Sequence, residues 1–116
     1  MSDRIQTFAE FWPYYLGEHR RPLCRALHFL GTSIYIGLTA LVIFTLPLSD
    51  WWMLLLAPIP AYALAWIGHY VIEKNRPATF SYPMWSLVSD FKMFGWMVTG
   101  RLWTGDLQHI VPVAAD

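Results

Sequence analysis

Two long runs without a charged residue dominate this sequence. The first extends from Ala26 to Ser49 and the second from Trp51 to Ile72. Each run supplies the roughly 20 apolar residues that a helix needs to cross the ~30 Å hydrocarbon core of a bilayer. Between them, Pro47-Leu48-Ser49-Asp50 has the composition of a tight turn. The sequence therefore predicts an integral membrane helical hairpin, with transmembrane helices at 26–48 and 51–73.

The composition agrees with a membrane protein and excludes other classes. Hydrophobic residues make up 56% of the 116 residues and charged residues only 14%. Charged residues make up about a quarter of an ordinary soluble domain. The length leaves room for a single membrane domain spanning 1–116. The net charge is zero and there is no basic tract, so nucleic acid is not an expected partner.

The N-terminal segment, residues 4–20, has the pattern of an amphipathic helix. Thr7 and Glu10 have the spacing of a capping box, which signals the start of a helix. A helix of this kind lies in the plane of the membrane surface, so the lipid bilayer is an expected partner. The apolar side chains fall on one stripe: Phe8, Phe11, Trp12 and Tyr15.

A third apolar helix is predicted at residues 81–101, but it carries charges near its middle. Asp90 and Lys92 would be costly at the centre of a bilayer. We therefore expect a C-terminal re-entrant or interfacial helix instead of a third crossing. Residues 102–116 are expected to form a polar tail, and the chain as a whole is expected to be all-α.

The positive side chains indicate which way the hairpin faces. Cytoplasmic loops of membrane proteins collect Lys and Arg. Both ends of the hairpin, and with them the N- and C-termini, are therefore expected in the cytoplasm. All eight Lys and Arg lie outside the hairpin turn: Arg4, Arg20, Arg21, Arg25, Lys74, Arg76, Lys92 and Arg101.

Two histidines are expected to meet near the cytoplasmic membrane surface. His28 precedes the centre of the turn, near Leu48 and Ser49, by about 20 residues, and His69 follows it by about 20. At a rise of 1.5 Å per residue, both lie ~30 Å from the turn. A candidate site is therefore predicted at the cytoplasmic face.

Small residues indicate how the two helices pack. Small side chains let helices approach closely in lipid, and Ser33 with Gly37 is the expected partner pair on the first helix. Such faces are also compatible with a homodimer. On the second helix, one face has residues at intervals of four: Ala57, Ala61, Ala65, His69 and Glu73.

Three imidazoles and a carboxylate near one another would form a metal site: His19, His28, His69 and Glu73. Imidazole suits iron, zinc, copper or nickel, and two histidines with a carboxylate suit non-haem Fe(II). A haem held by two histidines is disfavoured, since no attachment motif is present. The alternative is that these histidines are structural, with Glu73 as flanking charge. His109, in the polar tail, is expected to be solvated.

Two segments resemble the 2-hydroxy fatty acid dioxygenase family, which includes the enzyme of phytosphingosine breakdown and short bacterial membrane proteins. The first is Phe8 to His28, which contains Tyr14-x4-His19 and a second histidine nine residues later. The second is Gly-His-x3-Glu-Lys-x-Arg-Pro-Ala, from Gly68 to Ala78. The resemblance covers residues 8–101. It departs from the eukaryotic-type motif, a His-His pair followed by Asn, because Arg20 stands at the second position.

The resemblance implies an Fe(II)-dependent enzyme with His19, His28 and His69 as ligands. Glu73 is then a fourth ligand or a partner that orients His69, and Arg76 neutralises the substrate carboxylate or anchors a lipid phosphate. A 2-hydroxy fatty acid and O2 would give an acid one carbon shorter, CO2 and water. Two other functions stay open: a non-catalytic membrane scaffold with structural histidines, and a zinc-dependent lipid hydrolase.

Overall fold

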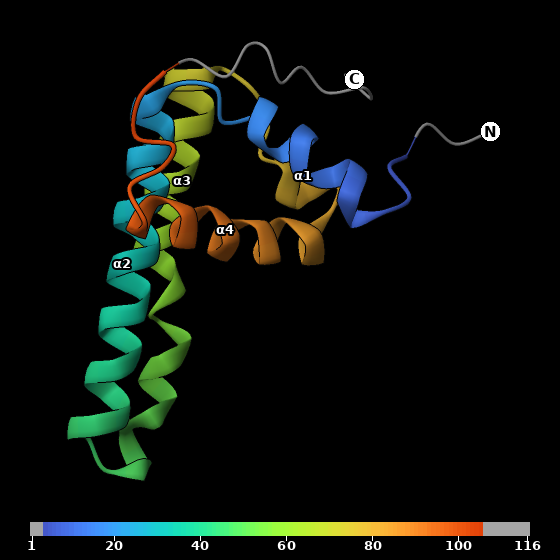
Figure 1. Cartoon of the computed structure of the whole chain (residues 1–116). Coiled ribbons are helices and arrows are strands. Elements are labelled where there is room, and N and C mark those ends of the chain that lie inside the picture. Colours follow the sequence, from blue (N-terminus) through green and yellow to red (C-terminus); the bar gives the residue numbers. More distant parts are fainter. Residues whose placement is uncertain (1–3, 106–116) are drawn as a thin grey trace.

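The computed structural model of the protein describes residues 4–105. All regular elements within this range are helical, and the two longest lie side by side as an antiparallel pair (Figure 1). The first is α2 (Pro22–Thr45), and the second is a helical segment over Leu48–Glu73. Both are long and apolar enough to cross a membrane. The prediction of an all-helical chain with two candidate spanning helices is confirmed.

Proline determines both ends of α2. Pro22 occupies the first helical position, where its missing N–H is not needed and its fixed φ is already helical. The helix therefore begins at Pro22, ahead of the residue 26 expected from the charge pattern. At the other end, Leu46 is extended, with φ −111° and ψ 150°, as expected for a residue that precedes a proline.

The second long segment changes its helical geometry twice. It begins as a 3₁₀ helix, η1 (Leu48–Leu55), continues as α3 (Pro58–Ile67) and ends in a π-helical turn, η2 (Gly68–Glu73). Pro58 and Pro60 both lie in the first turn of α3, where N–H groups lack partners within the helix. These prolines mark the change from 3₁₀ to α geometry.

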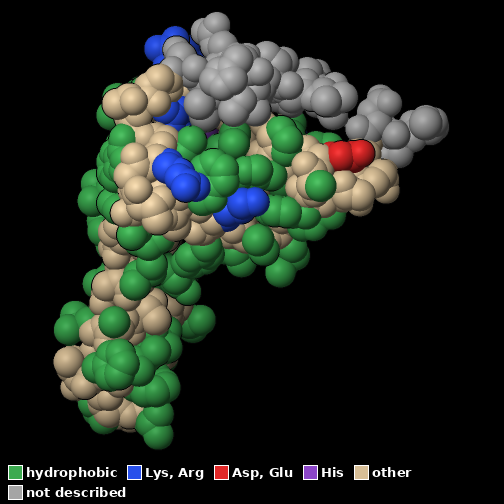
Figure 2. All heavy atoms as spheres, viewed as in Figure 1, with side chains coloured by type: hydrophobic (Ala, Val, Ile, Leu, Met, Phe, Trp, Pro, Cys, Tyr) green, Lys and Arg blue, Asp and Glu red, His purple; other side chains and the backbone are tan. Residues whose placement is uncertain are grey.

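The half of the hairpin next to its turn exposes mostly apolar side chains. Phe44 keeps 83% of its surface exposed, Leu48 75% and Leu55 79%. Figure 2 shows hydrophobic side chains over this end, whereas the Lys and Arg in view lie toward the opposite end. Soluble monomers rarely expose so large an apolar patch to water. A lipid environment fits this surface.

Two shorter helices, α1 (Phe8–Gly17) and α4 (Pro83–Val98), lie together on one side of the hairpin, beside the half away from its turn (Figure 1). The Thr7 hydroxyl caps α1 by accepting a hydrogen bond from the backbone N–H of Glu10 at 3.2 Å, as the capping-box spacing predicts. The aromatic stripe of α1 packs on α4 instead of facing lipid. Phe11 and Tyr15 are fully buried. The main buried cluster therefore lies between α1 and α4.

The helix α4 has one buried and one exposed face. Met93 and Met97 are buried in the cluster shared with α1. α1 lies on the side of α4 away from the hairpin turn, so the other face is directed toward the side on which the hairpin extends (Figure 1). The exposed face is apolar along the helix: Met84, Leu87, Val88, Phe91 and Val98.

The hairpin helices pack closely where Gly31 meets Ala61. A Cβ atom on Gly31 would lie 3.1 Å from both Cα and the carbonyl oxygen of Ala61, so no larger residue fits without displacing backbone. Ala61 belongs to the predicted contact face, but the predicted partner Gly37 is wrong. Nothing lies within 4 Å of a Cβ atom on Gly37. Gly31 is therefore the small residue that lets the helices approach.

Candidate metal centre

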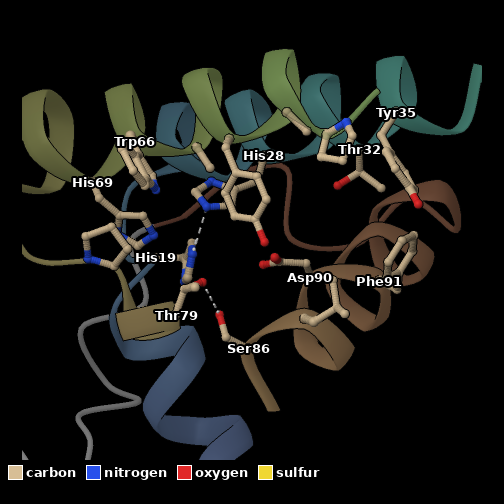
Figure 3. Close-up of a pocket in the computed structure, with 16 residues that line it drawn as sticks. His19, His28, Thr32, Tyr35, Trp66, His69, Thr79, Ser86, Asp90 and Phe91 are labelled. Carbon is tan, nitrogen blue, oxygen red and sulfur yellow. Dashed lines mark hydrogen bonds between the residues drawn. The ribbon is translucent and has the colours of Figure 1, made fainter. Parts of the chain in front are cut away.

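Three buried imidazoles converge at the open end of the hairpin. His19 lies in the turn between α1 and α2, His28 on α2, and His69 in η2. Each ring offers one nitrogen, and these nitrogens lie within 4.8 Å of one another (Figure 3). The ring centroids are 4.4, 4.5 and 5.0 Å apart. His28 and His69, which were expected to meet, have ring centroids 5.0 Å apart.

Backbone carbonyls one helical turn away fix the orientation of two rings. Nδ1 of His19 lies 2.7 Å from the carbonyl oxygen of Tyr15, and Nδ1 of His28 lies 2.9 Å from that of Cys24. A carbonyl oxygen can only accept, so each Nδ1 carries the hydrogen. Each Nε2 therefore keeps its lone pair, which is the form that binds a metal.

The third ring is oriented by a side chain. Nδ1 of His69 lies 2.8 Å from Oδ1 of Asn75, and the Asn75 amide nitrogen donates to the carbonyl of Glu18 at 3.0 Å. The backbone N–H of Asn75 also donates to the carbonyl of His69 at 2.9 Å. Asn75 therefore holds His69 and also ties it to the turn that carries His19. We did not single out Asn75 from the sequence, although it lies within the Gly68–Ala78 motif.

The geometry fits a metal ion bound by three nitrogens. Nε2 of His19 and Nε2 of His28 are 3.1 Å apart, and with both hydrogens on Nδ1 there is none between them. Two nitrogens bound to one ion at ~2.1 Å and at ~90° are ~3.0 Å apart. Facing lone pairs at this distance repel, and a shared cation removes the repulsion. The residues present therefore suit a metal centre with positions left open.

Electrostatics keep the His19 ring in its ligand form. Burial lowers the pKa of His19 well below its ordinary value, and the neighbouring rings of His28 and His69 lower it further. The imidazole is then neutral at physiological pH. A neutral imidazole is the form that coordinates a metal without first losing a proton.

A glycine allows the hairpin to close at this centre. A Cβ atom on Gly68 would lie 2.9 Å from the Sγ atom of Cys24 and 3.5 Å from Cε1 of His28. The start of η2 therefore contacts α2 directly beside two of the histidines. Any side chain at Gly68 would push against the ring of His28.

The π-helical turn moves Glu73 away from the three histidines. A π turn contains more residues than the 3.6 of an α turn, so Glu73 does not stack directly above His69. Its Oε2 accepts a hydrogen bond from the backbone N–H of Arg21 at 2.5 Å. Glu73 thus links the end of the second long helix to the residue that precedes α2. The three-residue group that could hold a metal consists of the histidines alone.

Arg76 lies on the surface. Its guanidinium carbon is 5.1 Å from the ring centroid of Phe80, and its side chain is exposed. It is not among the residues that line the cavity next to the histidines. The histidine at position 109 lies outside the described residues.

A cavity of about 320 Å³ opens beside the three histidines, between the hairpin and α4. Its volume is within the range of small-molecule sites, about 300–1,000 Å³. Aromatic rings of Tyr35, Trp66 and Phe91 form much of its wall, and Thr32 adds a hydroxyl (Figure 3). The site therefore combines three neighbouring imidazole nitrogens with a cavity between helices whose mostly apolar wall suits an apolar ligand.

Asp90 contributes a carboxylate to the same cavity (Figure 3). The hydroxyl of Tyr15 donates a hydrogen bond to Oδ1 of Asp90. Burial raises the pKa of Asp90 to about 7, although the bond from Tyr15 lowers it. Burial and the nearby carboxylate raise the pKa of Tyr15 well above its ordinary value. Asp90, whose charge led us to expect that residues 81–101 do not cross the membrane, thus lines the cavity beside the histidines.

A buried arginine joins the turn that carries His19 to the C-terminal end of the described chain. Arg25 is fully buried in α2, near His28. Its guanidinium is positively charged, and hydrogen bonds donated by a charged group are stronger than neutral ones. Sequence reasoning counted Arg25 only as a flanking charge. Its guanidinium donates to five backbone carbonyls: those of His19, Arg20, Leu102, Thr104 and Gly105.

Comparison with known proteins agrees with this site. A family model described as "2-hydroxy-palmitic acid dioxygenase Mpo1-like" matches residues 5–102. The match covers α1 through α4 and includes all three histidines. Among individual curated proteins and solved structures, none matches the chain.

Proposed function

The chain belongs to the Mpo1-like family of 2-hydroxy-palmitic acid dioxygenases, and from this premise we propose that it is an Fe(II)-dependent membrane dioxygenase. Its substrates are a 2-hydroxy fatty acid and O2. Its products are the fatty acid one carbon shorter, CO2 and water. These products account for every atom of the substrates, so the reaction needs no external reductant.

One observation carries the proposal. Three buried imidazoles each place one nitrogen within 4.8 Å of the others at the wall of a mostly apolar cavity, and Nδ1 of each ring is held by an oxygen. A purely structural histidine satisfies its polar atoms within the protein. Here three acceptor nitrogens face one another, which is favourable only when a cation or proton lies between them.

In this proposal, the protein's own residues bind the acyl chain and orient the three histidine rings. A metal held by His19, His28 and His69 would supply the activation of O2, chemistry typical of non-haem iron with open positions. The carbonyls of Tyr15 and Cys24 and the amide of Asn75 keep the three rings in their ligand tautomers. The aromatic cavity wall receives the acyl chain and excludes water.

Glu73 and Arg76 have supporting roles in this proposal. Glu73 keeps η2 in register with α2 through its bond to Arg21, and so positions His69 without binding the metal. Arg76, exposed over Phe80, binds a lipid phosphate or the carboxylate of an incoming acid at the membrane surface.

The exposed face of α4 supports an in-plane position at the cytoplasmic membrane surface. Its apolar side chains are directed toward the side on which the hairpin extends, so α4 can lie in the headgroup layer while the hairpin crosses the core. In a Cys24→Ser background, a cysteine at Ser49 should react with an impermeant thiol reagent in right-side-out vesicles, and a cysteine at the exposed Arg20 should not. The reverse labelling pattern would contradict this orientation.

The function is tested by metal and product analysis. Protein purified in detergent without oxygen is expected to carry iron in a one-to-one ratio, measured by elemental analysis. With 2-hydroxy-palmitic acid and O2, it should release CO2 and the acid shortened by one carbon, without a nicotinamide cofactor. Palmitic acid, which lacks the hydroxyl, is the control substrate and should not react.

Three other outcomes have distinct meanings. Stoichiometric iron with no conversion of 2-hydroxy acids would support the metal centre and contradict the proposed substrate. Zinc in place of iron would favour a lipid hydrolase. Protein that contains no metal and tolerates loss of the histidines would favour a scaffold with structural histidines.

A further inference from the structure

Asp90 is a carboxylate in a cavity whose other walls are mostly aromatic and aliphatic. It lies in the middle of α4 and shares the cavity with all three histidines (Figure 3). Placing a carboxylate in such surroundings is unfavourable unless hydrogen bonds compensate for the lost water. Met93 and Met97 provide buried apolar contacts of α4, and Asp90 adds one hydrogen bond, accepted from Tyr15.

Within residues 4–105, only one of the two carboxylate oxygens of Asp90 accepts a hydrogen bond. Oδ1 accepts the hydrogen bond from Tyr15. Among residues 4–105 no second hydrogen-bond donor to Asp90 is present. Its side chain is also only partly buried, although it lines the cavity. Oδ2 is therefore open to a molecule in the cavity.

The position of this carboxylate is fixed relative to the metal centre. Tyr15 is fully buried, and its ring stacks on that of His19 with centroids 4.1 Å apart. Its backbone carbonyl accepts from Nδ1 of His19 at 2.7 Å, while its hydroxyl bonds Asp90. Tyr15 thus orients the ring of His19 through its backbone carbonyl and holds the carboxylate of Asp90 through its hydroxyl.

We propose that Asp90 determines specificity by accepting a hydrogen bond from the hydroxyl of the bound 2-hydroxy acid. This inference rests on the proposed function. An ionised carboxylate can only accept, so its partner must carry a hydrogen. The ionised head group of the substrate has none, and the 2-hydroxyl is the one donor that the molecule offers. Unsubstituted and 2-oxo acids have no donor at this position.

The test compares ligand preference, measured on metal-free protein in detergent at pH 8 by calorimetric binding of three acids. The probes are 2-hydroxypalmitic acid, 2-oxopalmitic acid and palmitic acid. The wild-type protein should bind the 2-hydroxy acid about tenfold or more tightly than the other two, as expected for a hydrogen bond to a charged group. This readout does not depend on iron or turnover.

Asp90→Asn should abolish the preference for the 2-hydroxy acid. The amide oxygen can still accept from Tyr15, and the amide N–H then faces the cavity as a donor. The variant should lose its preference for the 2-hydroxy acid over the 2-oxo acid by about tenfold or more, while its affinity for palmitic acid stays unchanged. Ser89→Ala is the matched control on α4, because the buried Ser89 hydroxyl has no hydrogen-bond partner among the described residues. It should keep the wild-type preference.

A second variant covers the case in which Asp90→Asn does not fold. Asp90→Ser offers both a donor and an acceptor, so it should bind the hydroxy and oxo acids about equally. An unchanged preference in either folded variant would overturn the role of Asp90 and leave the proposed function intact. Equal binding of the hydroxy and oxo acids by the wild-type protein would overturn it too. If the wild-type protein also converts no 2-hydroxy acid, the proposed function fails with it.

Discussion

Changing any one of His19, His28 and His69 to alanine is expected to remove the bound metal and, with it, the conversion of 2-hydroxy-palmitic acid. Each substitution leaves two ligand nitrogens where three converge. The loss of metal affinity should exceed the ~10–100-fold that the hydrogen-bond partners of metal ligands typically contribute. Elemental analysis after anaerobic purification measures the metal, and release of CO2 measures the activity.

Graded controls separate ligands from their supports. Asn75→Ala and Glu73→Gln should each weaken metal binding by less, within ~10–100-fold, because they only loosen the position of His69. His109→Ala changes the same residue type outside the described residues and should have no effect. Full iron content in all three histidine variants would exclude the metal centre. Iron loss with unchanged activity would separate the metal from the reaction.

A second large effect is expected from Gly31→Leu. A Leu side chain there meets the backbone of Ala61, which cannot move aside as a flexible side chain would. Overpacking of this kind costs about 1–3 kcal/mol, and more where backbone is displaced. Thermal unfolding in detergent should occur at a lower temperature, and metal affinity should fall because the helix that carries His69 shifts away from His28.

Gly37→Leu is the matched control for this prediction. It introduces the same side chain into the same helix at a position with nothing within 4 Å of its Cβ atom. Because Leu has a higher helix propensity than Gly, the unfolding temperature should stay the same or rise. If both variants are destabilised equally, close packing at Gly31 is not what holds the two helices together.

The comparison of Gly31 with Gly37 shows what the sequence could and could not predict about packing. The contact face of the second helix was readable, because a regular helix brings every fourth residue to the same side. The face of α2 that contacts it could not be predicted. Gly31 and Gly37 are both small residues in one uninterrupted helix, and only the rotation of α2 about its axis decides which of them faces Ala61.

The meeting of His28 and His69 was predictable because the rise per residue of a helix is constant. The position of Glu73, away from the three histidines, could not be predicted. Nothing in the sequence of Gly68–Glu73 indicates that this turn is π-helical. A similar limit applies to α1. Its aromatic stripe suits a lipid surface and a neighbouring helix equally well, and only the position of α4 decides between them.

The role of Asp90 could be predicted only in part from the sequence. Its charge, together with that of Lys92, led us to expect that α4 does not cross the membrane, and α4 has 16 residues and is not one of the two helices long enough to span it. Its partner could not be read from the pattern. Tyr15 lies on a different helix 75 positions earlier, and there it looked like one more apolar member of a stripe.

The five carbonyls bound by Arg25 also have a consequence for the order of events during biosynthesis. Two of them belong to residues 19 and 20, whereas the others are 77, 79 and 80 positions after Arg25. A nascent chain exposes all three histidines well before it reaches Leu102. Until then the guanidinium lacks three of its acceptors, and the turn that carries His19 is held by fewer bonds. We therefore expect the three-histidine centre to reach its final geometry only after Gly105 has been synthesised.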